Sequence, residues 1–101
     1  MPKGIMVVQS APCDPAREDE YNDWYSRVHL PEILAIPGFT AARRYQVPQT
    51  GDYLAIYEID ADDLAGPAAE LRARSAAGLM HASDALRTDP PPVVTLYRLI
   101  G

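Results

Sequence analysis

The sequence has one cysteine and no long hydrophobic run, and each shortage excludes a class of protein. Because Cys13 stands alone, it cannot form an internal disulfide, and we interpret it as a small residue in a loop. The first ten residues, MPKGIMVVQS, contain an apolar run of only four residues. Such a run is too short for the core of a signal peptide or for a membrane span. We therefore expect a cytoplasmic protein.

Basic residues are also scarce. Nine Lys and Arg residues stand against fourteen Asp and Glu residues, which gives a formal net charge of −5. Arg43 and Arg44 form the only adjacent basic pair. Binding to nucleic acid phosphates or to an anionic membrane needs a basic surface, so we expect neither partner.

The common catalytic and cofactor signatures are missing. There is no paired-cysteine metal pattern, no H-E-x-x-H, no P-loop and no Rossmann glycine fingerprint. The two histidines, His29 and His81, are far apart in the sequence and give weak support for a metal site. We expect no cofactor and no metal, although the sequence leaves a haem ligand through either histidine open.

What is present fits a single globular domain over residues 1–101, with 48% hydrophobic and 23% charged residues. A first helix is expected after Asp14, which can cap it, with Pro15 at its first position. Pro31 predicts a break or kink near residues 28–30, followed by one more turn that ends at Pro37-Gly38. Strands are expected at 4–10, 39–47, 53–60 and 93–100, and a second helical tract at 62–87, divided by Gly78.

The order β-α-β-β-α-β predicts an α+β fold of the ferredoxin-like class, an antiparallel four-stranded sheet with both helices on one face. In three of the expected strands, apolar side chains point to both faces of the sheet: Ile5 and Val7 oppose Met6 and Val8, and the strands at 53–60 and 93–100 behave alike. Two helices cover one face only. We therefore predict a homodimer through the other face; the alternative is a monomer whose second helical tract wraps further around the sheet.

The stretch EYNDWYSRVHLPEILAIPGFTAARRY (20–45), followed by YLAIYEID (53–60), resembles the dimeric α+β barrel superfamily and, within it, the EthD-like members. The resemblance covers the whole chain in element order and is most specific in W-Y-x-x-V-H-L-P-E and P-G-F. It implies a ferredoxin-like protomer, a sheet-to-sheet homodimer and a small-molecule pocket between helix and sheet. Relatives include cofactor-free monooxygenases, polyketide cyclases, muconolactone isomerases and haem-binding proteins, so the fold alone does not select a reaction.

His29 is the leading catalytic candidate. In EthD-like proteins the histidine of the first helix lies in or near the pocket, and an imidazole is well suited to proton transfer near neutral pH. Tyr25 precedes it by four residues on the same face, and Glu32 follows by three and could orient or pair with the ring. The alternative is that His29 caps the end of the helix, where the helix dipole favours its charged form.

The other candidates are substrate-binding residues. Trp24 and Tyr25 belong to an aromatic stripe that is core by default and could also hold a ring. Arg43 shares a face with Tyr45 and Arg44 takes the other, so one of the two arginines points inward unless this is an edge strand with a solvated side. An inward arginine, such as Arg43, could bind an oxyanion; the alternative is an ion pair with Glu58 on the paired strand. The remaining candidates are Tyr45, Tyr57 and His81, and we expect His81 to face solvent unless its tract folds over the pocket mouth.

These residues predict a cofactor-independent enzyme that acts by acid–base proton transfer on a hydrophobic, aromatic or polyketide-like substrate. Cyclisation, dehydration and oxygenation of an activated phenol all fit. His29 would move the proton, Tyr57 or Tyr45 would stabilise the oxyanion, and Trp24 and Tyr25 would hold the ring. The alternative is a non-catalytic homodimeric protein that binds an apolar metabolite.

Overall fold

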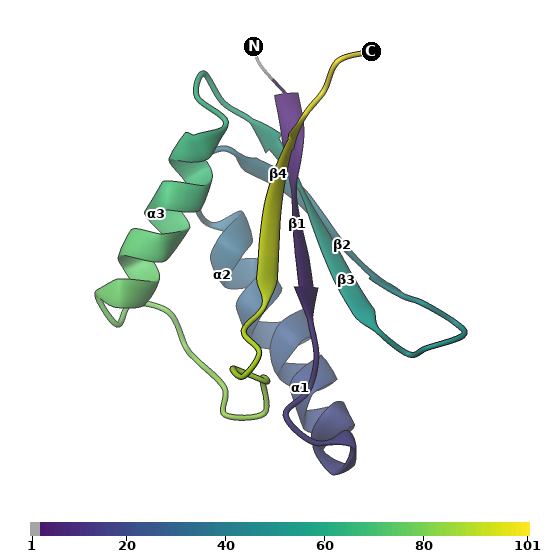
Figure 1. Cartoon of the computed structure of the whole chain (residues 1–101). Helices are drawn as coiled ribbons and strands as arrows, with labels where there is room; N and C mark the ends of the chain where they lie inside the picture. Colours follow the sequence, from purple (N-terminus) through teal and green to yellow (C-terminus); the bar gives the residue numbers. More distant parts are fainter. Residues whose placement is uncertain (1–2) are drawn as a thin grey trace.

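The computed structural model describes residues 3–101 and contains one four-stranded antiparallel sheet with its helices on one face (Figure 1). The strands are β1 (Lys3–Ser10), β2 (Phe39–Gln46), β3 (Tyr53–Asp60) and β4 (Val93–Arg98), and the helices are α1 (Glu18–Trp24), α2 (Leu30–Leu34) and α3 (Ala65–Ala76). The strand order is β2-β3-β1-β4, and every neighbouring pair is antiparallel. The predicted α+β, ferredoxin-like class is confirmed.

The first helix begins as the sequence predicts. The Asp14 carboxylate accepts a hydrogen bond from the Ala16 amide at 2.8 Å, and Pro15 opens a short 3-10 turn. Three acidic residues then occupy the first turn of α1, where the positive end of the helix dipole stabilises them.

The predicted break near residues 28–30 is wrong, because the helix continues through His29. Residues Tyr25–His29 form a π-helical turn, and the Leu30 amide donates to the carbonyl of Tyr25, five residues back. Leu30 itself keeps right-handed helical angles and begins α2. The wider turn accommodates Pro31, which has no amide hydrogen and whose ring crowds the preceding turn. A capping role for His29 at a helix end is therefore wrong.

The predicted second helical tract is correct only in its first half. Helix α3 ends at Ala76, where the Leu79 amide donates to the Arg74 carbonyl and the Gly78 amide donates to the Ser75 carbonyl. With Gly78 at a φ of +74°, these bonds form a Schellman motif.

The predicted helix over 79–87 is wrong, because this part of the chain pairs with the segment after β1. The Cys13 amide donates to the Ala85 carbonyl at 2.6 Å, and the Arg87 amide donates to the Ala11 carbonyl at 2.9 Å. These long-range bonds satisfy backbone groups that a helix would otherwise satisfy. Residues 77–92, which we call the crossing segment, run without regular structure from α3 to β4 (Figure 1).

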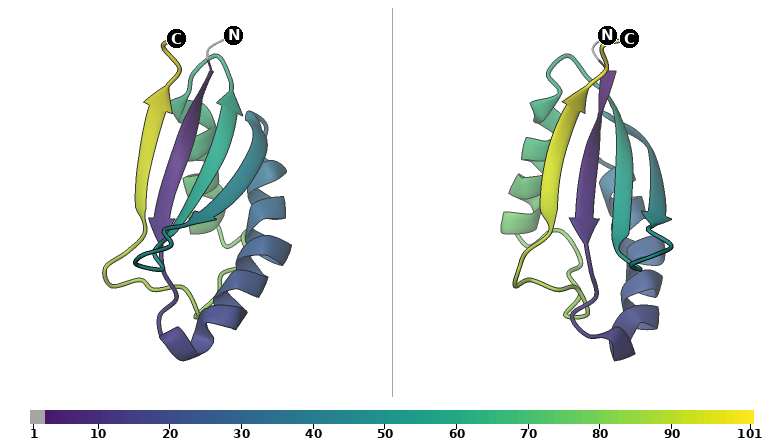
Figure 2. Two further views of the ribbon diagram at one scale, coloured as in Figure 1. Left: turned by 90° about the vertical axis from the view of Figure 1, so that its right-hand side faces the viewer. Right: turned by 45° about the vertical axis from the view of Figure 1, so that its right-hand side comes forward.

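Both faces of the sheet carry a group of apolar side chains, as the strand patterns predict, and the second face also carries the Arg43–Glu58 ion pair. On the helix side, the core contains Met6, Val8, Ala55, Tyr57 and Ile59 from the strands and Tyr21, Tyr25, Ile33 and Ile36 from the helical side. On the other side, which we call the open face, the register aligns Ile5, Val7, Leu54, Ile56, Val93 and Tyr97. Figure 2 shows the strands in front and all the helices behind them, so that nothing within residues 3–101 covers the open face.

Membrane insertion through a helix has no support in this structure. None of the helices within residues 3–101 is both long enough and apolar enough to cross a bilayer.

Gly38 provides a direct test of the connection between α2 and β2. Its φ is +105°, and a Cβ atom there would lie 2.5 Å from Cγ of Pro67. We expect Gly38→Ala to lower the free energy of unfolding by about 2 kcal/mol or more, from the positive φ and the clash together. In the matched control Gly66→Ala, the new methyl group meets nothing within 4 Å and lies inside α3, so stability should rise slightly. Chemical denaturation measures both; equal effects would contradict this description.

Candidate functional site

A cavity of about 490 Å³ lies between the helix side of the sheet, the first helical segment, α3 and the crossing segment. Its walls are mostly apolar, and its polar groups are a few hydroxyls, two imidazoles and one guanidinium. The residues on which the following description depends are Ser10, Trp24, Tyr25, His29, Arg72 and His81. An apolar cavity with a few polar groups is the usual form of a small-molecule site.

His29 lies in the wall of this cavity between two aromatic rings. Its imidazole stacks on the indole of Trp24, with a centroid distance of 4.6 Å and an interplanar angle of 23°, and meets the Tyr25 ring edge-on at 5.0 Å. Within residues 3–101 the imidazole makes no hydrogen bond, so its nitrogens are not committed to another side chain. The π-helical turn explains why residues five apart stack, since it shifts hydrogen bonding from four to five residues.

The environment of His29 keeps its imidazole neutral. Burial lowers its pKa to about 4; Glu32 acts in the opposite direction, and the positive charge of Arg44 lowers the pKa further. At pH 7 the ring therefore carries an unprotonated nitrogen that can accept a proton or a hydrogen bond.

Glu32 pairs with His81 and not with His29, which corrects the expected pairing. Its carboxylate lies 2.8 Å from Nδ1 of His81 and also accepts from the His81 backbone amide at 3.0 Å. Burial opposes ionisation of Glu32, but these hydrogen bonds outweigh it and lower the pKa of the carboxyl group. The indole of Trp24 donates to the His81 carbonyl at 2.9 Å. The crossing segment thus passes over the cavity. This is the arrangement in which we expected His81 to contribute to the site and not only to face solvent.

Behind His29, a group of tyrosines surrounds Arg44. The guanidinium lies 4.3 Å from the ring centroid of Tyr25 and donates to the side-chain carbonyl of Asn22 at 2.9 Å. The Tyr57 hydroxyl donates to the Tyr25 hydroxyl at 3.2 Å. Burial raises the pKa values of both tyrosines, so both hydroxyls keep their protons at neutral pH.

Strand alternation separates the two adjacent arginines. Arg43 lies on the open face, where it donates to the Glu58 carboxylate at 2.6 Å, so the predicted ion pair is confirmed. Tyr45 lies on the same face and is 50% exposed. Neither residue lines the cavity, and Arg44 is the arginine that points toward the helices. The alternating pattern alone identified one inward arginine but could not say which.

The structure therefore brings part of the predicted set together. Trp24, Tyr25, His29 and His81 line the cavity, Glu32 holds His81, and Tyr57 is fully buried behind Tyr25. Sequence reasoning missed Arg72 of α3, which also lines the cavity. It gave no signal because an arginine on a polar helix surface is the ordinary case.

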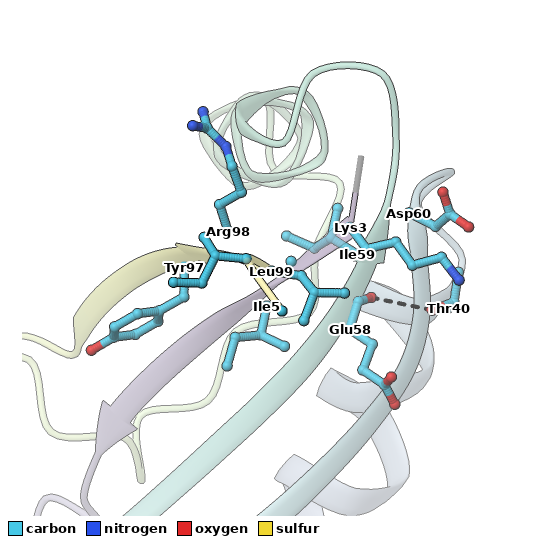
Figure 3. Close-up of a pocket in the computed structure, with 12 residues that line it drawn as sticks. Lys3, Ile5, Thr40, Glu58, Ile59, Asp60, Tyr97, Arg98 and Leu99 are labelled. Carbon is cyan, nitrogen blue, oxygen red and sulfur yellow. Dashed lines mark hydrogen bonds between the residues drawn. The ribbon is translucent and has the colours of Figure 1, made fainter. Parts of the chain in front are cut away.

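A second hollow, of about 540 Å³, lies at the end of the open face beside the C-terminal residues. Figure 3 shows Ile5, Tyr97 and Leu99 around it, with the Thr40 hydroxyl bonded to the Glu58 carbonyl. None of the predicted site residues lines this hollow, and it is continuous with the uncovered sheet surface. We therefore place the candidate site in the cavity on the helix side.

We also looked for side chains that could together bind a metal ion. Among residues 3–101 there is no cluster of three or more His, Cys, Asp or Glu side chains that could hold a metal ion.

Two solved structures share this arrangement of helices and strands. One is a monooxygenase from the gene ActVA-Orf6 of Streptomyces coelicolor in complex with the ligand nanaomycin D; it is 15% identical, with a TM-score of 0.55, over 97% of this chain and 88% of that chain. The other is an EthD family protein from Bacillus halodurans; it is 14% identical, with a TM-score of 0.54, over 99% of this chain and all of that chain. The chain shares the fold of these two proteins.

The resemblance of the sequence to EthD-like proteins of the dimeric α+β barrel superfamily is thus confirmed at the level of the fold. At this low identity the shared fold does not determine an activity. No protein-family model and no curated protein sequence matches the chain.

The neutral state of His29 makes a prediction about stability. The pKa of His29 is about 4 in the folded protein and 6.5 when it is unperturbed, so the unfolded chain binds more protons between these values. The stabilisation is complete above about pH 6.5 and is lost as the pH falls to about 4, a change of about 3 kcal/mol. His29→Phe keeps a stacked ring that cannot titrate. Between pH 7 and pH 4, wild type should lose about that much more unfolding free energy than His29→Phe; parallel curves would contradict the assignment.

Proposed function

We propose that the chain is a cofactor-independent enzyme that transfers protons on a hydrophobic, aromatic or polyketide-like substrate bound in the cavity. The observation that carries the proposal is the neutral His29 imidazole, free of hydrogen bonds within residues 3–101, in the wall of a largely apolar cavity of about 490 Å³. Support for this substrate class comes from the structure with nanaomycin D, whose fold this chain shares.

His29 acts as the proton acceptor. Its low pKa makes it a weak base, so it serves substrates whose proton is already acidic, such as a phenol or a carbon between a carbonyl and an aromatic ring. The indole of Trp24 keeps the imidazole in place and offers an adjacent flat surface for an aromatic substrate.

Tyr25 stabilises the negative charge that develops on the substrate oxygen. The earlier assignment of this role to Tyr57 or Tyr45 does not fit, because Tyr57 is fully buried and Tyr45 lies on the open face. Tyr25 lines the cavity, and its hydroxyl accepts a hydrogen bond from Tyr57, which makes Tyr25 a stronger donor toward the substrate.

Anthrone provides a suitable test, because it is an aromatic ketone with an acidic methylene group. Without oxygen in D₂O, wild-type protein should catalyse exchange of deuterium into this methylene group, and His29→Phe should reduce the rate at least about a hundredfold. Proton NMR measures the exchange. Tyr57→Phe should give a smaller loss, since it removes only the hydrogen bond to Tyr25.

Nanaomycin D binding, followed by quenching of Trp24 fluorescence, serves as the control. It should change little in His29→Phe, which keeps the ring stack. Equal exchange by wild type and His29→Phe would refute the role of His29.

The stack of His29 on Trp24 also favours a second candidate, a non-catalytic protein that binds an apolar metabolite. This candidate predicts tight nanaomycin D binding in wild type and His29→Phe alike, with no exchange by either protein.

We also propose that the protein is a homodimer formed through the open face. The centre of the face is apolar, with Ile5 and Val7 of β1 beside Leu54 and Ile56 of β3. Its edge carries Val93, Tyr97 and Leu99, each more than half exposed. An uncovered apolar surface of this extent favours association with a second copy, in keeping with the EthD-like resemblance.

Sedimentation equilibrium at micromolar concentration tests the dimer. Wild type should have twice the 11.1 kDa mass of the protomer. Ile56→Lys places a charge at the centre of the open face, next to Arg43, and should shift the protein to the protomer mass. The control Leu79→Lys makes a similar apolar-to-charged change at an exposed residue outside the sheet and should leave the dimer intact. A wild-type protein at the protomer mass would refute the proposal.

A further inference from the structure

Glu32 and His81 form a carboxylate–imidazole pair at the rim of the cavity. The pair joins α2 to the crossing segment, 49 residues apart in sequence, through the 2.8 Å contact between the carboxylate and Nδ1. The His81 backbone amide donates to both oxygens of the same carboxylate, at 3.0 and 3.3 Å. Glu32 thereby holds the backbone and the ring of His81 at once.

This arrangement determines which ring nitrogen of His81 is available. The ionised Glu32 carboxylate can only accept a hydrogen bond, so Nδ1 of His81 carries a hydrogen, and Nε2 makes no hydrogen bond within residues 3–101. The His81 side chain is 83% exposed and also lines the cavity. Nε2 therefore has access to solvent from a fixed position beside the cavity, as in carboxylate–histidine pairs that act as acid–base groups.

His29 needs such a neighbour. A proton that His29 accepts creates a buried cation near Arg44, and burial and Arg44 both oppose that cation. The proton must leave before another turnover begins. Two charged or titratable side chains besides His29 line the cavity, Arg72 on α3 and His81, and Glu32 on α2 contacts His81. The indole of Trp24 stacks on the His29 ring and donates to the His81 backbone carbonyl.

We infer that His81, oriented by Glu32, is a second acid–base group of this site and passes the proton released in the cavity to solvent. The inference rests on the proposed function. The proton moves from the substrate to His29, across water to Nε2 of His81, and from there to solvent. While His81 carries two protons, the Glu32 carboxylate neutralises the imidazolium, and loss of the Nε2 proton restores the starting state.

Deuterium exchange into anthrone under anaerobic conditions tests this step, because a proton that cannot leave His29 returns to the same carbon. His81→Asn keeps the backbone bonds to Glu32 and Trp24 but removes Nε2, and it should lower the exchange rate at least tenfold. Free imidazole should restore most of the rate in His81→Gly. Glu32→Gln should lower the rate less and shift the pH dependence of exchange, since a neutral amide cannot stabilise the imidazolium.

Asp84→Asn is the matched control. It breaks the 2.6 Å ion pair between Arg17 and Asp84, another tether of the crossing segment, and leaves the imidazole of His81 in place. Its exchange rate should equal that of wild type.

Three results would overturn the inference. Unchanged exchange in His81→Asn would refute it and leave the proposed function intact. A rate that falls only in proportion to nanaomycin D binding, without rescue by imidazole, would show that His81 merely holds the segment in place. Absence of exchange by wild type would overturn the proposed function and this inference together.

Discussion

The inability of Pro31 to donate a backbone hydrogen bond is the constraint on which the site depends. The helix accommodates the proline through a π-helical turn over Tyr25–His29, in which the Leu30 amide donates to the carbonyl of Tyr25, five residues back. This turn places His29 against Trp24, one residue further back than the usual i, i+4 neighbour. The turn before the proline therefore keeps the helix continuous and also determines where the His29 imidazole lies.

The site also depends on the crossing segment, which covers the cavity although it is distant in sequence from the first helix. The Schellman motif at Gly78 ends α3, and the crossing segment then attaches to the first half of the protein at several points. Trp24 and Glu32 bind His81, and Arg17 binds Asp84. The cavity therefore has a rigid wall of helix and sheet on one side and a cover held by polar contacts on the other. Most residues of this cover are exposed, but Ala85 is buried and Met80 and Leu86 pack against the core.

The fold was predictable from the sequence because its strands alternate clearly and its turns carry strong signals. The ferredoxin-like order, the cap at Asp14 and the two apolar faces follow from local patterns that tertiary contacts reinforce. The path of residues 79–87 was not predictable, because its apolar spacing suits a helix and only pairing with residues 11–13 overrides that preference.

The site was predictable only in part, for a similar reason. Trp24, Tyr25 and His29 lie on one helix, so their proximity follows from spacing. The pairing of Glu32 with His81 depends on how the crossing segment folds back, and no local pattern encodes it. The assignment of Arg43 and Arg44 to opposite faces depends on the strand register, which becomes certain only once β2 is aligned with β3.

The central claim is that His29 is a neutral imidazole that faces a ligand cavity. Titration of ¹⁵N-labelled protein by NMR observes this ring directly, and His29→Phe assigns its signals. The account predicts a neutral His29 at pH 7, a midpoint near pH 4, and a change in the His29 nitrogen shifts when nanaomycin D is added. A midpoint near pH 6.5 with nitrogen shifts that do not respond to nanaomycin D would contradict it.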